Sequence, residues 1–269
     1  MSQSILLDQT ISASVPHIFR RPLLHVAGTD PLLTVATLLA LGPKIYVDGL
    51  VVLEDHKTVG LIGGRHAIEY ILYHQRDWMK GTASNIMIKS FSTLDSDRRL
   101  VDALDLFVKS EFAFVPITVD QKVVTTLSVR DALRVVVDSK LETPIREISS
   151  QAITTSIKSS IGNTLETMLE ENVRSLIVHG ENGISVVNDR MILEYLLSHD
   201  GRQVTSEGLR GLYGVEIGAL KPEQAENIDA KTPASLAADR LLNSHAPCLY
   251  MEGEAIVTPW DIVIKGLLH

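Results

Sequence analysis

The pattern of hydrophobic and polar residues repeats along the chain in units of about 60 residues. In the clearest unit, residues 91–94 form a short extended run, and apolar residues follow at helical spacing at Leu100, Leu104 and Phe107. Two short β-like runs and a helix over 129–138 complete this unit. The pattern therefore predicts the order β-α-β-β-α.

A short pattern marks the predicted junction between the last strand and the closing helix of each unit. In order, it has one small residue, two mostly apolar residues, a small polar residue or glycine, and two variable positions. A seventh position follows, which is aspartate in two of the copies, and then the apolar start of a helix. Its four copies begin at residues 60, 125, 185 and 255, and we number the units 1 to 4 accordingly. The chain thus consists of four related units.

The units resemble each other in pairs. Units 1 and 3 resemble each other in their closing helices, and units 2 and 4 resemble each other in the residues of the junction pattern. A unit of this size cannot cover both faces of its sheet, so we expect the units to pair. The predicted fold is α/β (α+β), with residues 1–138 as a first module and 139–269 as a second. The polar segment 199–214 is predicted to be a long linker between units 3 and 4.

Composition excludes several classes of protein. Of the 269 residues 45% are hydrophobic and 5% aromatic, and the net charge is −8. This acidic balance argues against nucleic-acid binding, and the longest apolar run, 32–41, is too short to cross a membrane. The first ten residues have no basic side chain and do not resemble a signal peptide. The single cysteine, Cys248, is expected to be an inert core thiol, and the protein is expected to be cytoplasmic.

Two copies of the junction pattern carry side chains suited to a ribose and its phosphate. Ser128 is followed by Asp131, and Thr258 by Asp261. The hydroxyl and the free amides of a first helical turn can bind an anion, and the aspartate can accept two hydrogen bonds from a vicinal diol. Units 1 and 3 lack this combination and carry instead the pairs Gly63/His66 and Asn188/Met191. The sequence predicts two competent half-sites and two degenerate ones.

Simpler roles for these residues remain open. Ser128 and Thr258 could serve only as helix caps. An arginine occupies one slot of the pattern in three units, at Arg65, Arg130 and Arg190. Each could bind a phosphate or be a solvated residue at a helix start. Trp260 takes this slot in unit 4, where packing is favoured over base stacking.

The repeated unit resembles the cystathionine-β-synthase (CBS) domain. The likeness rests on the β-α-β-β-α order, the strand endings at Ser128 and Thr258, and the pairs Val115-Pro116 and Ala246-Pro247. The resemblance covers roughly residues 8–269. Two CBS domains form a Bateman module, and the whole chain is similar to a regulatory subunit that consists of two such modules. The resemblance implies binding of an adenosine ligand, either AMP, ADP, ATP or S-adenosylmethionine. It assigns the following residues to the ligand: Ser92, Ala113, Phe114, Val115, Ser128, Arg130 and Asp131 in unit 2, and Ile228, His245, Ala246, Thr258 and Asp261 in unit 4.

Two classes of function are compatible with this pattern, and a third is disfavoured. The first is a non-catalytic sensor that binds adenine nucleotides and acts on a protein partner or a second copy of itself. The second is a structural interaction subunit without a physiological ligand, or a regulatory subunit of a kinase-like complex. An enzyme is disfavoured, because no nucleophile–base pair or metal-ligand spacing occurs.

Overall fold

The computed structural model describes residues 3–42, 48–110, 112–181, 183–253 and 255–268. The predicted order of elements is confirmed, with one shortened copy. Unit 1 comprises β1 (His25–Ala27), α3 (Leu32–Leu41), β2 (Gly49–Glu54), β3 (Lys57–Gly63) and α4 (Gly64–His74). Unit 2 comprises β4 (Leu94–Asp95), α6 (Leu100–Ser110), β5 (Phe114–Val119), β6 (Lys122–Ser128) and α7 (Val129–Ser139).

The second half of the chain repeats this order. Unit 3 comprises β8 (Thr154–Ser156), α8 (Ile161–Glu170), β9 (Ser175–Gly180), β10 (Gly183–Asn188) and α9 (Asp189–Leu197). Unit 4 comprises α12 (Ala234–Ser244), β12 (Leu249–Met251), β13 (Ala255–Val257), the π-helical turn η6 (Asp261–Lys265) and α13 (Gly266–Leu268). Its first strand is reduced to one parallel bridge between Asn227 and Tyr250.

Further short elements connect the units. An N-terminal arm contains α1 (Gln3–Leu7), α2 (Ile11–Ser14) and the 3-10 helix η1 (Pro16–Arg20). The other connecting elements are η3 (Gln75–Lys80), α5 (Ala83–Ile86), η4 (Ile145–Glu147), β7 (Ser150–Gln151), η5 (Ile217–Leu220) and β11 (Glu223–Gln224). The prediction of a linker over 199–214 is wrong, because this segment folds into α10 (His199–Ser206) and α11 (Leu209–Gly214).

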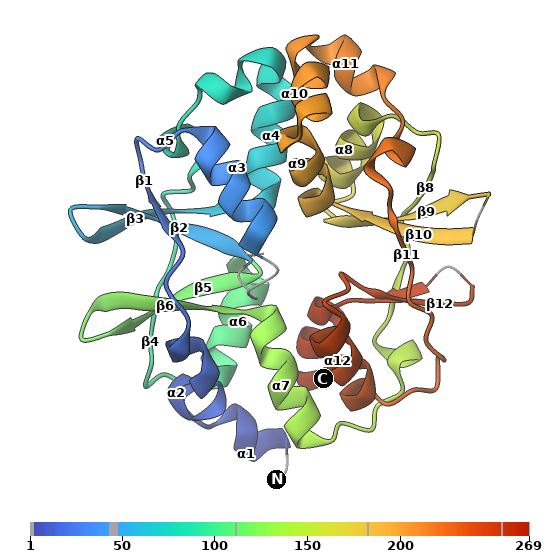
Figure 1. The fold of residues 1–269 in the computed structure, drawn as a ribbon. Helices are drawn as coiled ribbons and strands as arrows, with labels where there is room; N and C mark the ends of the chain where they lie inside the picture. Colours follow the sequence, from blue (N-terminus) through green and yellow to red (C-terminus); the bar gives the residue numbers. More distant parts are fainter. Residues whose placement is uncertain (1–2, 43–47, 111, 182, 254, 269) are drawn as a thin grey trace.

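The four small sheets lie at the two sides of the molecule, with helices between them (Figure 1). The strand orders are β1-β2-β3, β4-β5-β6, β11-β10-β9-β8 and β12-β13-β7. β7 precedes unit 3 but pairs with β13 of unit 4, and β11 precedes unit 4 but pairs with β10 of unit 3. The segment leading into one unit therefore covers the sheet edge of its neighbour.

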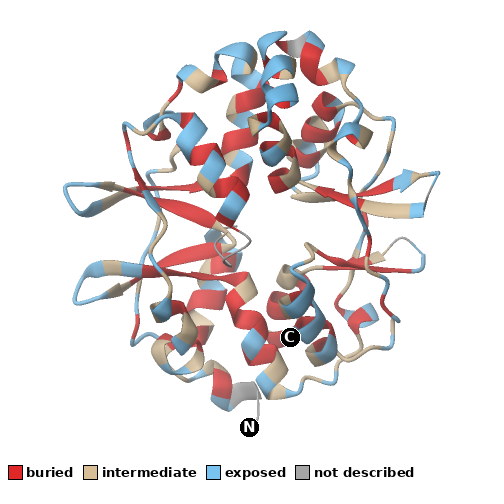
Figure 2. Ribbon diagram, viewed as in Figure 1, coloured by how far each residue is buried: buried red, intermediate tan, exposed pale blue. Residues whose placement is uncertain are grey.

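The two main cores join units that are distant in the sequence. Units 2 and 4 share one core, in which α7 packs against α12, and the N-terminal arm adds Ile11, Val15 and Ile18 to it. Units 1 and 3 share the other, in which α3 packs against α9. Figure 2 shows the buried residues concentrated on these central helices and on the strands. Both cores cross the predicted boundary at residue 138, and the division into two modules stays a prediction.

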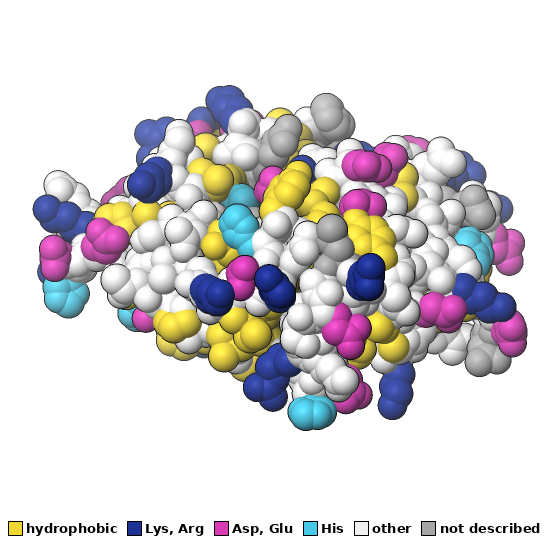
Figure 3. Space-filling view, turned by 90° about the horizontal axis from the view of Figure 1, so that it is seen from above, with side chains coloured by type: hydrophobic (Ala, Val, Ile, Leu, Met, Phe, Trp, Pro, Cys, Tyr) yellow, Lys and Arg dark blue, Asp and Glu magenta, His cyan; other side chains and the backbone are white. Residues whose placement is uncertain are grey.

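The end of the molecule formed by α10 and α11 has a mixed surface. Acidic and basic side chains are interspersed there with hydrophobic ones (Figure 3).

No helix in the described part of the chain is long and apolar enough to span a bilayer.

Candidate functional site

The junction of unit 2 brings the predicted pair Ser128 and Asp131 together. Ser128 ends β6 and caps α7, and its hydroxyl oxygen accepts a hydrogen bond from the Asp131 amide at 3.2 Å. The Ser128 amide and hydroxyl both donate to Asp131 Oδ2 at 2.8 Å. This reciprocal arrangement is a capping box. Ser128 is 0% and Asp131 2% exposed, so the junction is closed to solvent.

Two basic side chains of the N-terminal arm occupy the rest of the Asp131 carboxylate. Arg21 donates from Nη1 to Oδ1 at 2.7 Å and from Nη2 to Oδ2 at 2.6 Å. His17 Nε2 lies 3.4 Å from Oδ1. Burial raises the pKa of Asp131, but the bonds from His17 and Arg21, the charge of Arg21 and the Ser128 amide outweigh it and hold the pKa below its ordinary value.

The junction of unit 4 has the same plan with different partners. Thr258 donates to Asp261 Oδ2 from its amide at 2.9 Å and from its hydroxyl at 2.7 Å. Asp261 Oδ1 accepts from the Ser150 hydroxyl at 2.7 Å and lies 2.7 Å from Lys265 Nζ. Asp261 is 3% exposed. In both units, one carboxylate oxygen bonds the cap and a cation of the same chain neutralises the charge.

Units 1 and 3 keep the capping role with other side chains. The Gly63 amide donates to His66 Nδ1 at 3.0 Å, and the Met191 amide donates to Asn188 Oδ1 at 2.8 Å. Burial, with the charge of Arg65, lowers the pKa of His66. Helix capping is thus the role that all four junctions share, and ligand binding by two of them stays a prediction.

The three arginines of the repeated slot bridge units that face each other. Arg130 donates to the carbonyls of Leu241 at 3.0 Å and Ala246 at 2.9 Å, at the end of α12. Arg190 donates to the Asp48 carbonyl at 2.6 Å. Arg65 donates to the Asn172 side chain and to the Leu169 carbonyl. Trp260, in the same slot, packs against the core of units 2 and 4.

A cluster of charges lies between units 1 and 3, with Asp189 and Arg190 buried and Arg174 and Asp48 half-buried. Arg174 Nε donates to Asp189 Oδ2 at 2.9 Å, and its Nη1 donates to Asp48 at 3.4 Å. Burial, together with the neighbouring charge of Arg174, lowers the pKa of Arg190 to about 10. Burial opposes ionisation of Asp189, but the charges of Arg174 and Arg190 hold its pKa below the ordinary value. Arg174 and Arg190 thus connect unit 3 to Asp48 across the interface of the two units.

A cleft of 410 Å³ lies between units 1 and 2. Its lining combines aromatic, aliphatic and hydroxyl side chains with one cation: Leu61, Ser90, Phe91, Ser92, Leu106, Lys109, Ser110, Phe112, Phe114 and Val115. Three of the predicted residues, Ser92, Phe114 and Val115, are among them. Ala113 is half-buried beside it, and its carbonyl accepts from the Val129 amide. Ser128, Arg130 and Asp131 do not line the cleft.

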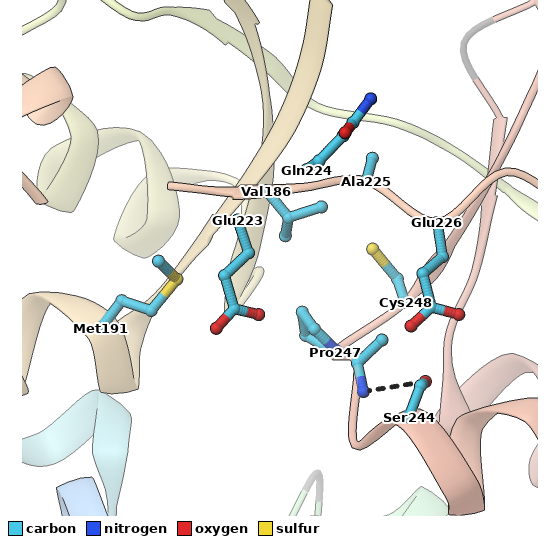
Figure 4. Close-up of a pocket in the computed structure, with 10 residues that line it drawn as sticks. Val186, Met191, Glu223, Gln224, Ala225, Glu226, Ser244, Pro247 and Cys248 are labelled. Atoms are coloured by element: carbon cyan, nitrogen blue, oxygen red, sulfur yellow. Dashed lines mark hydrogen bonds between the residues drawn. The ribbon is translucent and has the colours of Figure 1, made fainter. Parts of the chain in front are cut away.

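A much smaller pocket of 40 Å³ lies between units 3 and 4. Glu223 and Glu226 extend toward it, whereas Gln224 points away (Figure 4). Of the residues predicted for unit 4, Ala246 lines this pocket. His245 is exposed in a left-handed conformation at the end of α12, and Ile228 is buried in the core of units 2 and 4. The structure does not bring these three residues together around one space.

Sequence reasoning missed the partners of both aspartates. Lys265 follows Asp261 by four residues, the spacing of an ion pair along a helix, and that signal was available. Arg21 lies 110 positions from Asp131, and no sequence pattern links them.

Within the described residues, no group of three His, Cys, Asp or Glu side chains could hold a metal ion.

Comparison with known proteins supports the resemblance. Residues 83–138 match the sequence profile of the CBS domain. No curated protein matches the chain. A solved structure from Methanocaldococcus jannaschii, described as a candidate archaeal homologue of the γ subunit of AMP-activated protein kinase, aligns with a TM-score of 0.79 and 16% identity, over 91% of this chain and 96% of the other.

A second structure, an uncharacterized conserved protein from Pyrococcus horikoshii, aligns with a TM-score of 0.55 and 14% identity, over 82% of this chain and 91% of the other. Identities this low establish a shared fold alone. Residues 83–138 thus match one CBS domain, and the other units repeat its order of elements, so the chain has a fold built of four CBS-like units.

Proposed function

We propose that this chain is a regulatory protein that binds an adenosine ligand and transmits its occupancy to a partner protein or a second copy of the chain. The observation that carries the proposal is the 410 Å³ cleft between units 1 and 2. Its volume falls within the range of about 300–1,000 Å³ that small-molecule sites occupy.

The lining of this cleft suits a nucleotide. Phe91 and Phe112 offer aromatic surface for a planar base, and Ser92 offers a hydroxyl for hydrogen bonding to it. Lys109, which is exposed at the end of α6, supplies a positive charge for a phosphate. Phe114 pairs with Ser128 across β5 and β6, so the cleft adjoins the junction that holds Asp131.

The wider resemblance favours a non-catalytic role. The fold is shared with a protein described as a homologue of a kinase γ subunit, so a kinase-like complex is a candidate assembly for this chain. The single cysteine fits a reducing compartment such as the cytoplasm.

Calorimetric titration of the full chain with AMP, ADP, ATP and S-adenosylmethionine tests the proposal. We expect up to two ligands per chain. Lys109→Ala should weaken ATP binding by about two- to fivefold, because an exposed charge pair contributes up to about 1 kcal/mol. Lys122→Ala is the matched control, since Lys122 is exposed at the start of β6 and outside the cleft. Equal effects of the two variants would contradict a ligand phosphate at Lys109.

A structural subunit without a ligand is the second candidate. It is favoured by one observation, that the carboxylates of Asp131 and Asp261 are both bonded by side chains of the same chain. Absence of binding for all four ligands would support this alternative.

A further inference from the structure

The cleft between units 1 and 2 and the pocket between units 3 and 4 lie at equivalent places of the repeat. Leu61 lines the cleft and Val186 lines the pocket, and each is the second residue of its junction pattern. Met191, the seventh residue of the pattern in unit 3, also lines the pocket (Figure 4). Its equivalent in unit 1 is His66, whose ring packs against Phe112 of the cleft wall with the ring centroids 5.6 Å apart. His66 thus takes the place beside the cleft that Met191 takes beside the pocket.

Hydrogen bonding fixes the tautomer of His66. Its Nδ1 accepts from the Gly63 amide at 3.0 Å, and a ring nitrogen that accepts carries no proton. Burial and the charge of Arg65 lower the pKa of His66 and favour its neutral form. The proton of the neutral ring is therefore on Nε2, and no described residue accepts a hydrogen bond from it. Nε2 is not one of the buried, unbonded polar atoms of the described chain, so it is open to solvent and to a ligand.

His66 caps its helix as the aspartates of units 2 and 4 do, but it offers a ligand the opposite hydrogen-bonding character. Asp131 Oδ2 and Asp261 Oδ2 accept from the amide of their cap residue, at 2.8 and 2.9 Å, as His66 Nδ1 does. The other oxygen of a carboxylate accepts hydrogen bonds, whereas Nε2–H donates one and accepts none. Among the described residues that line the cleft, none is acidic. This lining therefore lacks the carboxylate that would bind both hydroxyls of a ribose.

Resting on the proposed function, we infer that His66 is a specificity-determining residue of the cleft between units 1 and 2, and that this cleft binds ribonucleotides and 2′-deoxyribonucleotides of adenine alike. A single donor needs one acceptor, which either sugar hydroxyl can supply. Loss of the 2′-hydroxyl then leaves the 3′-hydroxyl to accept from Nε2–H. The base keeps the aromatic rings of the cleft as its partners, and the phosphate keeps Lys109.

The equivalent pocket between units 3 and 4 is less suited to a nucleotide. Its volume is 40 Å³, and Glu223 and Glu226 extend toward it (Figure 4). Their negative charges oppose a phosphate, and the Met191 sulfur is only a weak acceptor. The tighter binding event is therefore expected to belong to the cleft, and weakening by Lys109→Ala verifies this.

The test compares ATP and 2′-deoxy-ATP by calorimetric titration of the full chain. The measured quantity is the ratio of the two dissociation constants, taken for the binding event that Lys109→Ala weakens. His66→Asp introduces the missing carboxylate, and Asp131 shows that an aspartate can accept from the cap amide at this position of the repeat.

Two further variants separate the carboxylate from other effects of the change. His66→Asn is the conservative variant, because Asn85 Oδ1 accepts from the Thr82 amide at 2.8 Å in the same way at the start of α5. His56→Asp is the matched control, because it makes the same substitution in unit 1 at a position exposed in the turn between β2 and β3.

We expect the wild type to bind ATP and 2′-deoxy-ATP with dissociation constants within about threefold of each other. His66→Asp should bind ATP about tenfold more tightly than 2′-deoxy-ATP, because its carboxylate gains a charged hydrogen bond from the 2′-hydroxyl. The added negative charge lowers the affinity for both nucleotides, and the ratio cancels this effect. His66→Asn, whose amide donates a hydrogen bond as Nε2–H does, should retain the wild-type ratio, and so should His56→Asp.

A wild type that prefers ATP by more than about threefold overturns this inference and leaves the proposed function intact. An equal ratio in His66→Asp and His56→Asp, both shown to be folded by thermal unfolding, overturns it as well. The wild-type ratio decides the matter if His66→Asp does not fold. Binding of neither nucleotide, or equal effects of Lys109→Ala and Lys122→Ala, contradicts the proposed function itself. The two failures are therefore distinguishable.

Discussion

Phe114 of β5 packs its ring against Gly49 of β2 so closely that a β-carbon on Gly49 would lie 2.1 Å from Phe114 Cε1. The same β-carbon would lie 2.8 Å from the Ile62 carbonyl oxygen. Phe114 is 3% exposed, so its ring has little room to move away. This contact fixes the approach of units 1 and 2 beside the cleft, and it makes glycine a requirement at position 49.

We predict that Gly49→Ala destabilises the protein by about 1–3 kcal/mol, the usual cost of an overpacked contact. Urea unfolding measures this cost. Gly214→Ala is the control, because a β-carbon there would meet nothing within 4 Å. Adding Phe114→Leu to Gly49→Ala should recover part of the loss. A Gly49→Ala protein as stable as Gly214→Ala would contradict the close contact.

The ion pair of Arg174 and Asp189 leads to a second prediction. Asp189 has a side chain 2% exposed, and Arg174 Nε donates to it at 2.9 Å. Arg174→Ala should destabilise the protein by about 1.5–3 kcal/mol, because it leaves a buried carboxylate short of a donor. Denaturant unfolding is the measurement. Arg134→Ala, which removes the same charge from an exposed position on α7, should cost far less. Equal costs would mean that Asp189 finds another donor.

Local patterns of the sequence were sufficient to predict most elements. The apolar stripe of α6 and the cap at Ser128 were predicted correctly, because periodicity and capping depend on neighbouring residues. The segment 199–214 was mistaken for a linker because it is polar and rich in glycine. There the glycines permit close packing: a β-carbon on Gly201 would lie 2.0 Å from the Tyr195 carbonyl oxygen.

The candidate site was harder to predict, because it depends on contacts between distant segments. Ser128 and Asp131 were identified from the repeat, but the role of Arg21 arises only when the N-terminal arm folds onto unit 2. Arg130 donates to the Leu241 and Ala246 carbonyls of unit 4, a contact that the repeat does not reveal, and its assignment to a ligand stays a prediction. No property of the isolated repeat distinguishes these possibilities.

The thiol of Cys248 should be protected in the native protein. Burial, with a contribution from the charge of Asp261, raises the pKa of this thiol to about 12. At pH 8 only about one thiol in 10,000 would then be ionised, and the thiolate is the reactive form. We expect a disulfide reagent to label the folded protein far more slowly than the protein in guanidinium chloride. Since Cys248 is the single cysteine, the signal has one source, and equal labelling rates would refute its burial.

The last prediction concerns the acid sensitivity of the fold and depends on the lowered pKa of Asp131. An unfolded aspartate has a pKa near about 3.9. Because the folded pKa lies below that value, the ionised carboxylate stabilises the fold fully above about pH 4. This contribution is lost as the pH falls through the folded pKa, where native Asp131 becomes protonated. Stability should therefore decline with acid more steeply in the wild type than in Asp131→Asn, which cannot ionise.

Urea unfolding at a series of pH values from neutral into the acid range measures this difference. Asp120→Asn is the isosteric control, because Asp120 is exposed in the turn between β5 and β6. Its free energy of unfolding should fall with pH as steeply as that of the wild type. Asp131→Asn should have a lower free energy of unfolding at neutral pH and should lose less of it toward acid pH. If the stability of Asp131→Asn fell with pH as steeply as that of the wild type, the contacts from Arg21 and His17 would not be responsible for the loss of stability in acid. The fold would then owe its acid sensitivity to other buried carboxylates, of which Asp189 carries a lowered pKa of its own.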